Sequence, residues 1–184
     1  MDTLQNRIVA GFLCLLIILA SSVVGVASTL MPMRSQVSGL FYDGTRENPG
    51  IARDLREISV QAFNLTVVAG RYLAPGYPAT SRVLEARNDL DRAMHSQSPR
   101  EMRRAKDALV GATQALHSTL SGLELTSQDE YFMLSLMADI SSRISLIGQS
   151  PYNQSAVVFN QALTRFPANI LGPAAGVRPL ELFE

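Results

Sequence analysis

Residues 8–33 read IVAGFLCLLIILASSVVGVASTLMPM, and this 26-residue run contains no charged side chain. A helix needs about 20 apolar residues to cross a hydrocarbon layer about 30 Å thick, so residues 8–31 are long enough to span a bilayer. Ser21, Ser22 and Ser28 do not prevent a span, because their hydroxyls can bond to the backbone of their own helix. The sequence therefore predicts a transmembrane helix at 8–31, preceded by a short flank at 1–7.

The same run can also be interpreted as a cleaved secretory signal. Ile8–Ala20 would then be its apolar core, and Gly25-Val26-Ala27 its small-residue cleavage site. An anchor that stays attached is favoured for two reasons. Arg7 in the flank is balanced by Asp2, and the apolar run continues beyond the cleavage site.

Basic residues near the predicted span indicate its orientation. Arg7 precedes the span, whereas Arg34, Arg46, Arg53 and Arg56 follow it. Because the side richer in basic residues tends to stay in the cytoplasm, we expect a single-pass protein of the cell membrane. Its bulk domain would be cytoplasmic and its short N-terminus outside, with the lipid bilayer as one partner.

Composition excludes several classes of protein and site. The 184-residue chain has 16 basic and 16 acidic side chains, so it lacks the basic excess of a protein that binds nucleic acid. A hydrophobic content of 47% is sufficient for a folded core. The single cysteine and two distant histidines do not suit a disulfide framework or a metal site. We expect no cofactor and no metal.

The rest of the chain has the three- and four-residue apolar spacing of packed helices, and no long alternation of period two. Short segments rich in glycine and proline separate the helical segments, as expected for neighbours that run antiparallel. The sequence predicts an all-α protein: an antiparallel up-and-down four-helix bundle over 50–170, followed by a tail over 171–184. The stripes are Leu55, Ile58, Ala62, Leu65, Ala69 and Tyr72; Val83, Ala86, Leu90 and Ala93; Met102, Ala105, Leu109, Ala112, Leu116 and Leu120; and Tyr152, Ala156, Phe159, Leu163 and Phe166.

Helix ends can also be predicted. Pro99 suits a first helical turn, with Glu101 behind it. Ser127 and Glu130 fit a capping box before residues 131–147, which are apolar on most sides and are therefore expected to form the most buried helix. Pro151 falls inside a potential long helix over 127–166, where its ring would either kink or break the helix.

Residues 32–49 form the predicted juxtamembrane segment and hinge. Met33, Val37, Leu40 and Phe41 make an apolar helical stripe, so residues 33–41 are predicted to continue the spanning helix. The glycines and proline within 43–50 then favour a hinge at 43–49. The alternative is that the stripe docks onto the bundle, against the tail at Leu182 and Phe183.

The last fifth of the chain resembles a known family. The Tyr-Asn pair at 152 is followed seven residues later by Phe-Asn and seven further by Phe-Pro-Ala-Asn, and then by a tail with Gly-Val and Phe-Glu. This pattern over residues 152–184 is similar to the LemA family, although Gly148 and Pro151 interrupt a helix that the family usually continues. The resemblance implies a bacterial membrane-tethered four-helix bundle without catalytic residues to transfer. The signature residues are Tyr152, Asn153, Phe159, Asn160, Phe166, Pro167, Asn169, Gly176 and Phe183.

These residues also have a physical interpretation. Tyr152, Phe159 and Phe166 would share one helix face, where core packing is favoured over an aromatic ligand groove. Asn153 and Asn160 lie beside that face, where buried amides can fix the register between helices; ligand contact is the alternative. Pro167 is expected to stop the helix and Asn169 to form a local turn, and the apolar tail residues Leu180, Leu182 and Phe183 are expected to fold back on the bundle.

No recognisable catalytic motif is present, and we do not expect an enzyme. Asp129 and Glu130 resemble an acid/base pair but fit a helix first turn better. Arg100, Arg103, Arg104 and Lys106 form the one basic cluster, interpreted as a solvated helix end or as a site for anionic headgroups. The expected function is a membrane-anchored interaction or scaffold module, with its protein partner left open. The alternative is an extracytoplasmic domain that binds a small ligand or peptide.

Overall fold

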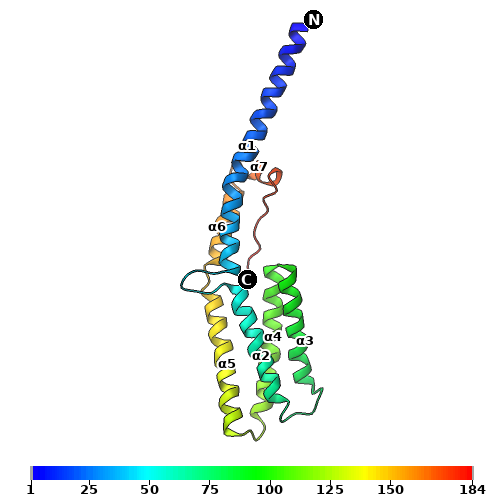
Figure 1. Ribbon diagram of the computed structural model, residues 1–184, viewed down its shortest axis with the longest axis vertical. Coiled ribbons are helices and arrows are strands. Elements are labelled where there is room, and N and C mark those ends of the chain that lie inside the picture. The colour runs from blue at the N-terminus through cyan, green and yellow to red at the C-terminus, as the bar shows by residue number, and fades with distance from the viewer. Residues whose placement is uncertain (1, 184) are drawn as a thin grey trace. The chain divides into compact units, whose positions relative to one another are not determined.

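The computed structural model describes residues 2–183, with side chains from Val9 onward. Every regular element in that range is a helix, which confirms the predicted all-α class (Figure 1). The chain divides into two compact units. The first joins the chain up to Ser38 with residues 154–180, and the second joins residues 39–153 with the end of the chain from Glu181. The single bundle predicted over 50–170 is therefore wrong in its C-terminal limit.

Four antiparallel helices make up most of the second unit: α2 (Ile51–Ala69), α3 (Pro78–Ser96), α4 (Pro99–Ser121) and α5 (Ser127–Gly148) (Figure 1). α2 packs against the other three, and α3 packs against α4. The predicted apolar stripes of these helices supply the core. Its buried side chains include Leu55, Ile58, Leu65, Val83, Leu90, Met102, Leu109, Leu116, Leu120, Met133, Leu136 and Ile140.

Capping side chains fix where two helices of this unit, α4 and α5, begin. Pro99 occupies the first turn of α4, as predicted, and the Ser98 hydroxyl accepts a hydrogen bond from the Glu101 amide at 3.4 Å. At α5 the predicted capping box of Ser127 and Glu130 is wrong by one residue. The Thr126 hydroxyl is the cap and accepts from the Asp129 amide at 3.2 Å, because Thr126 is the last residue with extended backbone.

Pro151 breaks the long helix that the sequence allowed. α5 ends at Gly148, and α6 (Tyr152–Leu163) starts after three residues. Proline has no amide hydrogen to donate to Ile147. The Ser150 amide instead bonds to the Ile147 carbonyl at 3.1 Å, and the Ser150 hydroxyl lies 3.4 Å from the Tyr152 amide.

The expectation that residues 131–147 form the most buried helix is wrong. One stripe of α5, which includes Met133, Leu136 and Ile140, is buried. Tyr131 and Leu134 are exposed on other sides of the helix, Tyr131 to 76%. The reason is that α5 packs chiefly against α2, which leaves apolar residues on its outward side exposed.

α1 (Asp2–Tyr42) is one unbroken helix that continues through Pro32. Among the described residues it alone is long and apolar enough to cross a membrane, over Val9–Tyr42, and its most apolar stretch is not buried. The predicted helix at 33–41 is confirmed as the end of α1. In the second unit, Phe41 makes edge contacts with the rings of Tyr152 at 4.9 Å and Phe183 at 5.7 Å, which favours the docking alternative for this residue.

The segment after α1 is a closed turn. Gly44 and Pro49 pair as an antiparallel bridge, and the Thr45 amide donates to the Asn48 carbonyl at 2.8 Å. Gly44 has φ +80° and its position leaves no room for a Cβ, which would lie 2.3 Å from the Asn48 carbonyl oxygen. The mobility expected of a hinge at 43–49 stays a prediction.

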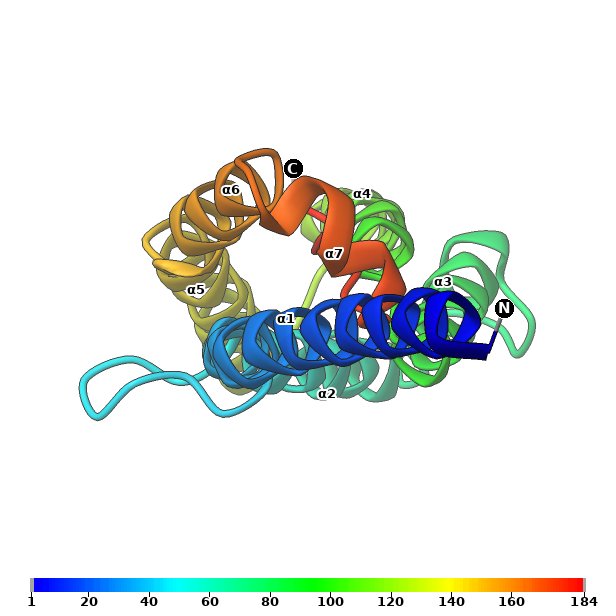
Figure 2. The ribbon, with the colours of Figure 1, turned by 90° about the horizontal axis from the view of Figure 1, so that it is seen from above.

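The first unit contains α1 up to Ser38, α6 from Gln154, the short helix α7 (Ala168–Ala174) and an extended stretch to Leu180. Its buried apolar residues are Leu30, Val37, Ala156, Phe159, Val177 and Leu180. The burial predicted for Phe159 is confirmed. Seen from above in Figure 2, α7 leads from the end of α6 toward α1.

One ion pair links α2 to α5 inside the second unit. Nη1 of Arg143 donates to Oδ1 of Asp54 at 3.1 Å, and Asp54 is only 1% exposed. Burial raises the pKa of Asp54, and the Arg143 guanidinium opposes that rise without cancelling it. The pair therefore places a buried carboxyl group of raised pKa in contact with a guanidinium counter-charge.

Replacing Arg143 by Met removes the positive charge that lies beside the buried carboxyl group of Asp54. We expect Arg143→Met to lower the unfolding free energy of the detergent-solubilised protein by about 2–4 kcal/mol at pH 7, measured by urea titration. The loss should shrink as the pH falls through the raised pKa of Asp54 and the carboxyl group becomes neutral. Adding Asp54→Leu should recover most of the stability.

Arg92→Met is the matched control, because Arg92 pairs with Asp89 on the exposed surface of α3. Such exposed pairs contribute at most about 1 kcal/mol. Equal losses for Arg143→Met and Arg92→Met would show that the buried pair has no special importance.

Candidate functional site

The C-terminal tail is held by asparagine side chains of α6. In the first unit, Nδ2 of Asn160 donates to the Leu180 carbonyl at 2.8 Å, and the Leu180 amide donates to Oδ1 of Asn160 at 2.8 Å. One side-chain amide thus satisfies both backbone groups of a buried residue, as a neighbouring β-strand would. We call this two-bond arrangement an asparagine clamp.

A second asparagine clamp lies in the second unit. Nδ2 of Asn153 donates to the Phe183 carbonyl at 3.0 Å, and the Phe183 amide donates to Oδ1 of Asn153 at 2.8 Å. The Tyr152 hydroxyl donates to the Glu181 carbonyl at 2.6 Å. The predicted fold-back of Phe183 is confirmed, since its side chain is buried.

The predicted role of Asn153 and Asn160 in fixing the register between helices is therefore wrong. They do not fix the register between helices but bind the backbone of the extended tail. The sequence signal was present in their seven-residue spacing, which places both amides on one side of α6. Their partners were missed because backbone groups of a tail carry no side-chain signature.

The three aromatic rings predicted on one face have different surroundings. Tyr152 is buried beside Phe41 in the second unit, and Phe159 is buried in the first. Phe166 is 81% exposed, so the prediction that it packs in the core is wrong. α6 ends at Leu163, and Phe166 therefore no longer lies on the face of that helix.

The remaining signature residues shape the segment after α6. The Phe166–Pro167 peptide is cis, and Asn169 lies within α7 rather than in a turn. Gly176 follows α7 with φ +72°, a conformation that glycine adopts without strain. These residues turn the chain from α6 back into the extended tail.

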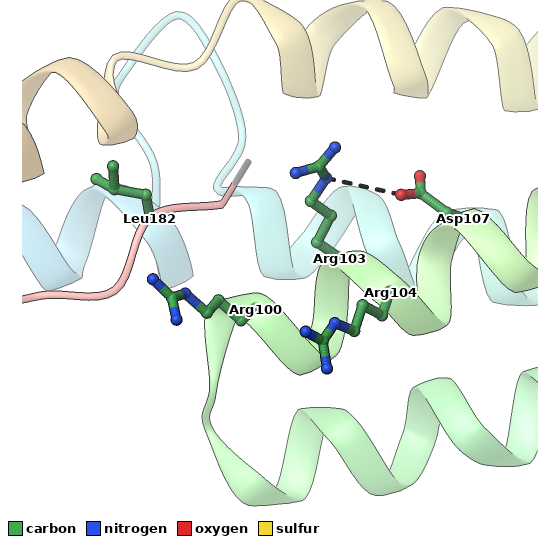
Figure 3. Close-up of a pocket in the computed structure, with 5 residues that line it drawn as sticks. All are labelled: Arg100, Arg103, Arg104, Asp107 and Leu182. Carbon is green, nitrogen blue, oxygen red and sulfur yellow. Dashed lines mark ion pairs between the residues drawn. The ribbon is translucent and has the colours of Figure 1, made fainter.

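The predicted basic cluster borders an open groove of about 550 Å³ in the second unit, lined by Arg100, Arg103, Arg104, Asp107 and Leu182 (Figure 3). Nε of Arg103 lies 3.6 Å from Oδ2 of Asp107. Among the described residues, Arg100 and Arg104 have no acidic partner within 4.0 Å. Lys106 is not part of the groove, because it pairs with Asp107 at 2.8 Å and lies over the Phe183 ring. The groove can attract an anion through two unpaired guanidinium groups.

Asp129 belongs to a polar cluster at the start of α5. Its Oδ2 accepts from the Tyr72 hydroxyl at 2.6 Å, and its Oδ1 accepts from Nη1 of Arg71 at 2.5 Å. The hydrogen bond from Tyr72 is the main cause that lowers the pKa of Asp129, with Thr126 and Arg71 adding to it. Asp129 thus connects the segment after α2 to the start of α5.

Neither a metal site nor a relative indicates the chemistry of the described residues. Within the described residues, no group of three histidine, cysteine or acidic side chains is arranged to hold a metal ion. The chain matches no protein-family model, no curated protein and no solved structure.

Removing the clamp of Asn160 should release the tail. Asn160→Ala leaves the buried Leu180 amide and carbonyl without partners, which costs about 1–3 kcal/mol. We expect a lower unfolding free energy and faster proteolysis after Gly176 in the full-length protein. Asn160→Asp keeps the acceptor and should have a smaller effect on tail cleavage than Asn160→Ala. Gln161→Ala, at an exposed neighbouring position, is the control; if it accelerates cleavage equally, the clamp does not hold the tail.

The lowered pKa of Asp129 predicts a specific pH dependence. A depressed carboxyl pKa adds stability that is present above the unfolded-state value, about 3.9, and is lost as the pH falls through the folded-state value. Asp129→Asn should therefore be less stable than the native protein at pH 7, and the difference should narrow below about pH 4. Glu124→Gln, in the exposed loop before α5, should leave the stability difference near zero throughout. A gap between native protein and Asp129→Asn that does not change with pH would contradict the assignment.

Proposed function

We propose that this chain is a single-pass, membrane-anchored helical module of LemA type that acts as a scaffold or interaction partner rather than as a catalyst. The observation that carries the proposal is α1, which is charge-free over residues 8–33 and has its most apolar stretch uncovered by the rest of the protein. An apolar surface of this size needs a lipid environment.

Polar groups inside α1 support a lipid environment. The Ser22 hydroxyl donates to the Ile18 carbonyl at 2.8 Å, and the hydroxyls of Ser28 and Thr29 donate to the Gly25 carbonyl. Hydroxyls that bond within their own helix have little unmet demand for water. Residues Leu19 to Val26 also form one wall of a groove against the α6–α7 region. Cleavage after Ala27 would remove that wall, which favours an anchor that stays attached.

Exposed apolar residues support a binding role for the second unit. Tyr131 and Leu134 project from α5, and the bundle leaves them uncovered. Asp129 has a structural role, since it is engaged by Tyr72, Thr126 and Arg71. A partner protein on α5 and a cytoplasmic location of the bulk domain are parts of the proposal.

A second candidate function is an extracytoplasmic domain that binds a small anionic ligand or peptide. The groove beside Arg100 and Arg104 favours it, because two guanidinium groups face a groove of about 550 Å³. The two candidates differ in the side of the membrane on which the bulk domain lies. Protease added to intact cells or to inverted vesicles distinguishes them, since the scaffold proposal expects digestion only in inverted vesicles.

The anchor has its own test. After alkaline carbonate extraction the protein should stay in the membrane fraction, detergent should release it, and mass analysis should find residues 2–27 still attached. A variant with Leu15, Ile18 and Leu19 all changed to Asp is the control and should lose membrane retention. A native protein that begins at Ser28, or that leaves the membrane in carbonate, would disprove the anchor.

A further inference from the structure

The segment between α6 and the tail has an unusual composition for an exposed turn. Residues 166–177 contain no charged side chain, and they include α7. Phe166 and Ile170 are 81% and 63% exposed. Two large apolar side chains that project from a charge-free turn need a partner that excludes water.

This segment lies beside α1 in the first unit (Figure 2). Phe166, Ile170 and Leu171 line one side of an apolar groove of about 600 Å³, and the other side is formed by residues of α1 between Leu19 and Val26. The groove is therefore continuous with the part of α1 that has no protein cover.

The position of the groove along α1 sets its depth in a bilayer. The span proposed over residues 8–31 is about 36 Å of helix at about 1.5 Å per residue. Leu19 lies about 18 Å inside its C-terminal end, at the middle of the layer. Val26 lies about 8 Å inside that end. The groove and α7 thus fall within one leaflet, on the side where the rest of the chain emerges.

The backbone of the segment is suited to this depth. The Leu171 amide bonds to the Pro167 carbonyl at 3.0 Å, the Ala175 amide to Leu171 at 2.9 Å, and the Val177 amide to Gly172 at 3.0 Å. Internal hydrogen bonds of this kind are required of any backbone that enters hydrocarbon.

Charged side chains stop at both ends of the segment. Arg165 precedes it and Arg178 follows it, and both are exposed. Nε of Arg34 donates to the Arg178 carbonyl at 3.2 Å, which places Arg34 beside the C-terminal end of the segment. Arginines at the edge of an apolar surface suit the phosphate groups of phospholipids.

We infer that the α6–α7 turn inserts Phe166 and Ile170 into the acyl-chain layer beside α1, with Arg34 and Arg178 at the headgroup level. The occupant of the groove is phospholipid. The protein thereby holds the membrane at two points, a spanning helix and a shallow wedge. This inference rests on the proposed anchor.

The absence of tryptophan from the chain permits a direct test. Single-tryptophan variants Phe166→Trp and Ile170→Trp of the full-length protein are reconstituted into phosphatidylcholine–phosphatidylglycerol vesicles, with and without brominated acyl chains. Ile18→Trp, on the exposed surface of α1, reports the anchor. Val158→Trp, at a position 52% exposed on α6 of the same unit, is the matched control.

We expect brominated lipid to quench Phe166→Trp, Ile170→Trp and Ile18→Trp by at least twofold, with blue-shifted emission and little quenching by aqueous iodide. Val158→Trp should show the reverse pattern. Quenching of Ile18→Trp by lipid together with quenching of Phe166→Trp by iodide would overturn the wedge and leave the anchor intact. Failure of Ile18→Trp to respond to lipid would overturn both. A Phe166→Trp signal quenched by neither agent would mean that protein covers the turn, which also overturns the inference.

Discussion

A backbone in hydrocarbon must satisfy its hydrogen bonds internally, and α1 meets that requirement by remaining one helix for 41 residues. At about 1.5 Å per residue its length is about 60 Å, roughly twice the thickness of a hydrocarbon layer. In the proposed anchored arrangement, about half of the helix lies outside the lipid. Leu30, Val37 and Phe41 are buried at spacings of seven and four, so the same helix changes from uncovered to protein-covered along its length. The break at Gly44 comes only after this cover is complete.

Two carboxylates in the second unit show how the same chemical group acquires opposite properties. Asp54 lies where burial dominates, so its pKa is raised and one guanidinium group only partly compensates. Asp129 is also poorly accessible, but it accepts hydrogen bonds from a phenol, a hydroxyl and a guanidinium group, and its pKa is lowered. Both join α5 to α2 or to the segment that follows α2. The contact between α5 and the α2 region therefore combines apolar burial with two carboxyl groups whose pKa values are shifted in opposite directions.

Patterns that depend on helix geometry alone were predictable from the sequence. The stripes at Leu55, Leu90 and Leu109 are buried, and the i, i+7 pair of Tyr152 and Phe159 is buried as well. The predicted burial of Phe166 was wrong because the pattern assumed a helix that in fact ends at Leu163. The predicted burial of Tyr131 was wrong because apolar residues in a sequence do not indicate how many neighbouring helices will cover them. The partners of Asn153 and Asn160 were not predicted for a third reason: the sequence of an asparagine does not indicate which distant backbone group its amide will bind.

The spacing of the two asparagine clamps along α6 matches the spacing of their partners along the tail. Seven residues of helix separate Asn153 from Asn160, a rise of about 10.5 Å. Three residues of extended chain separate Leu180 from Phe183, a distance of about 10 Å. The rise of the helix over seven residues thus nearly equals the length of extended chain over three residues. A tail one residue longer or shorter between the clamps would leave one amide opposite the wrong peptide unit. Both asparagines lie on α6, so unwinding of this one helix would remove both clamps from the tail.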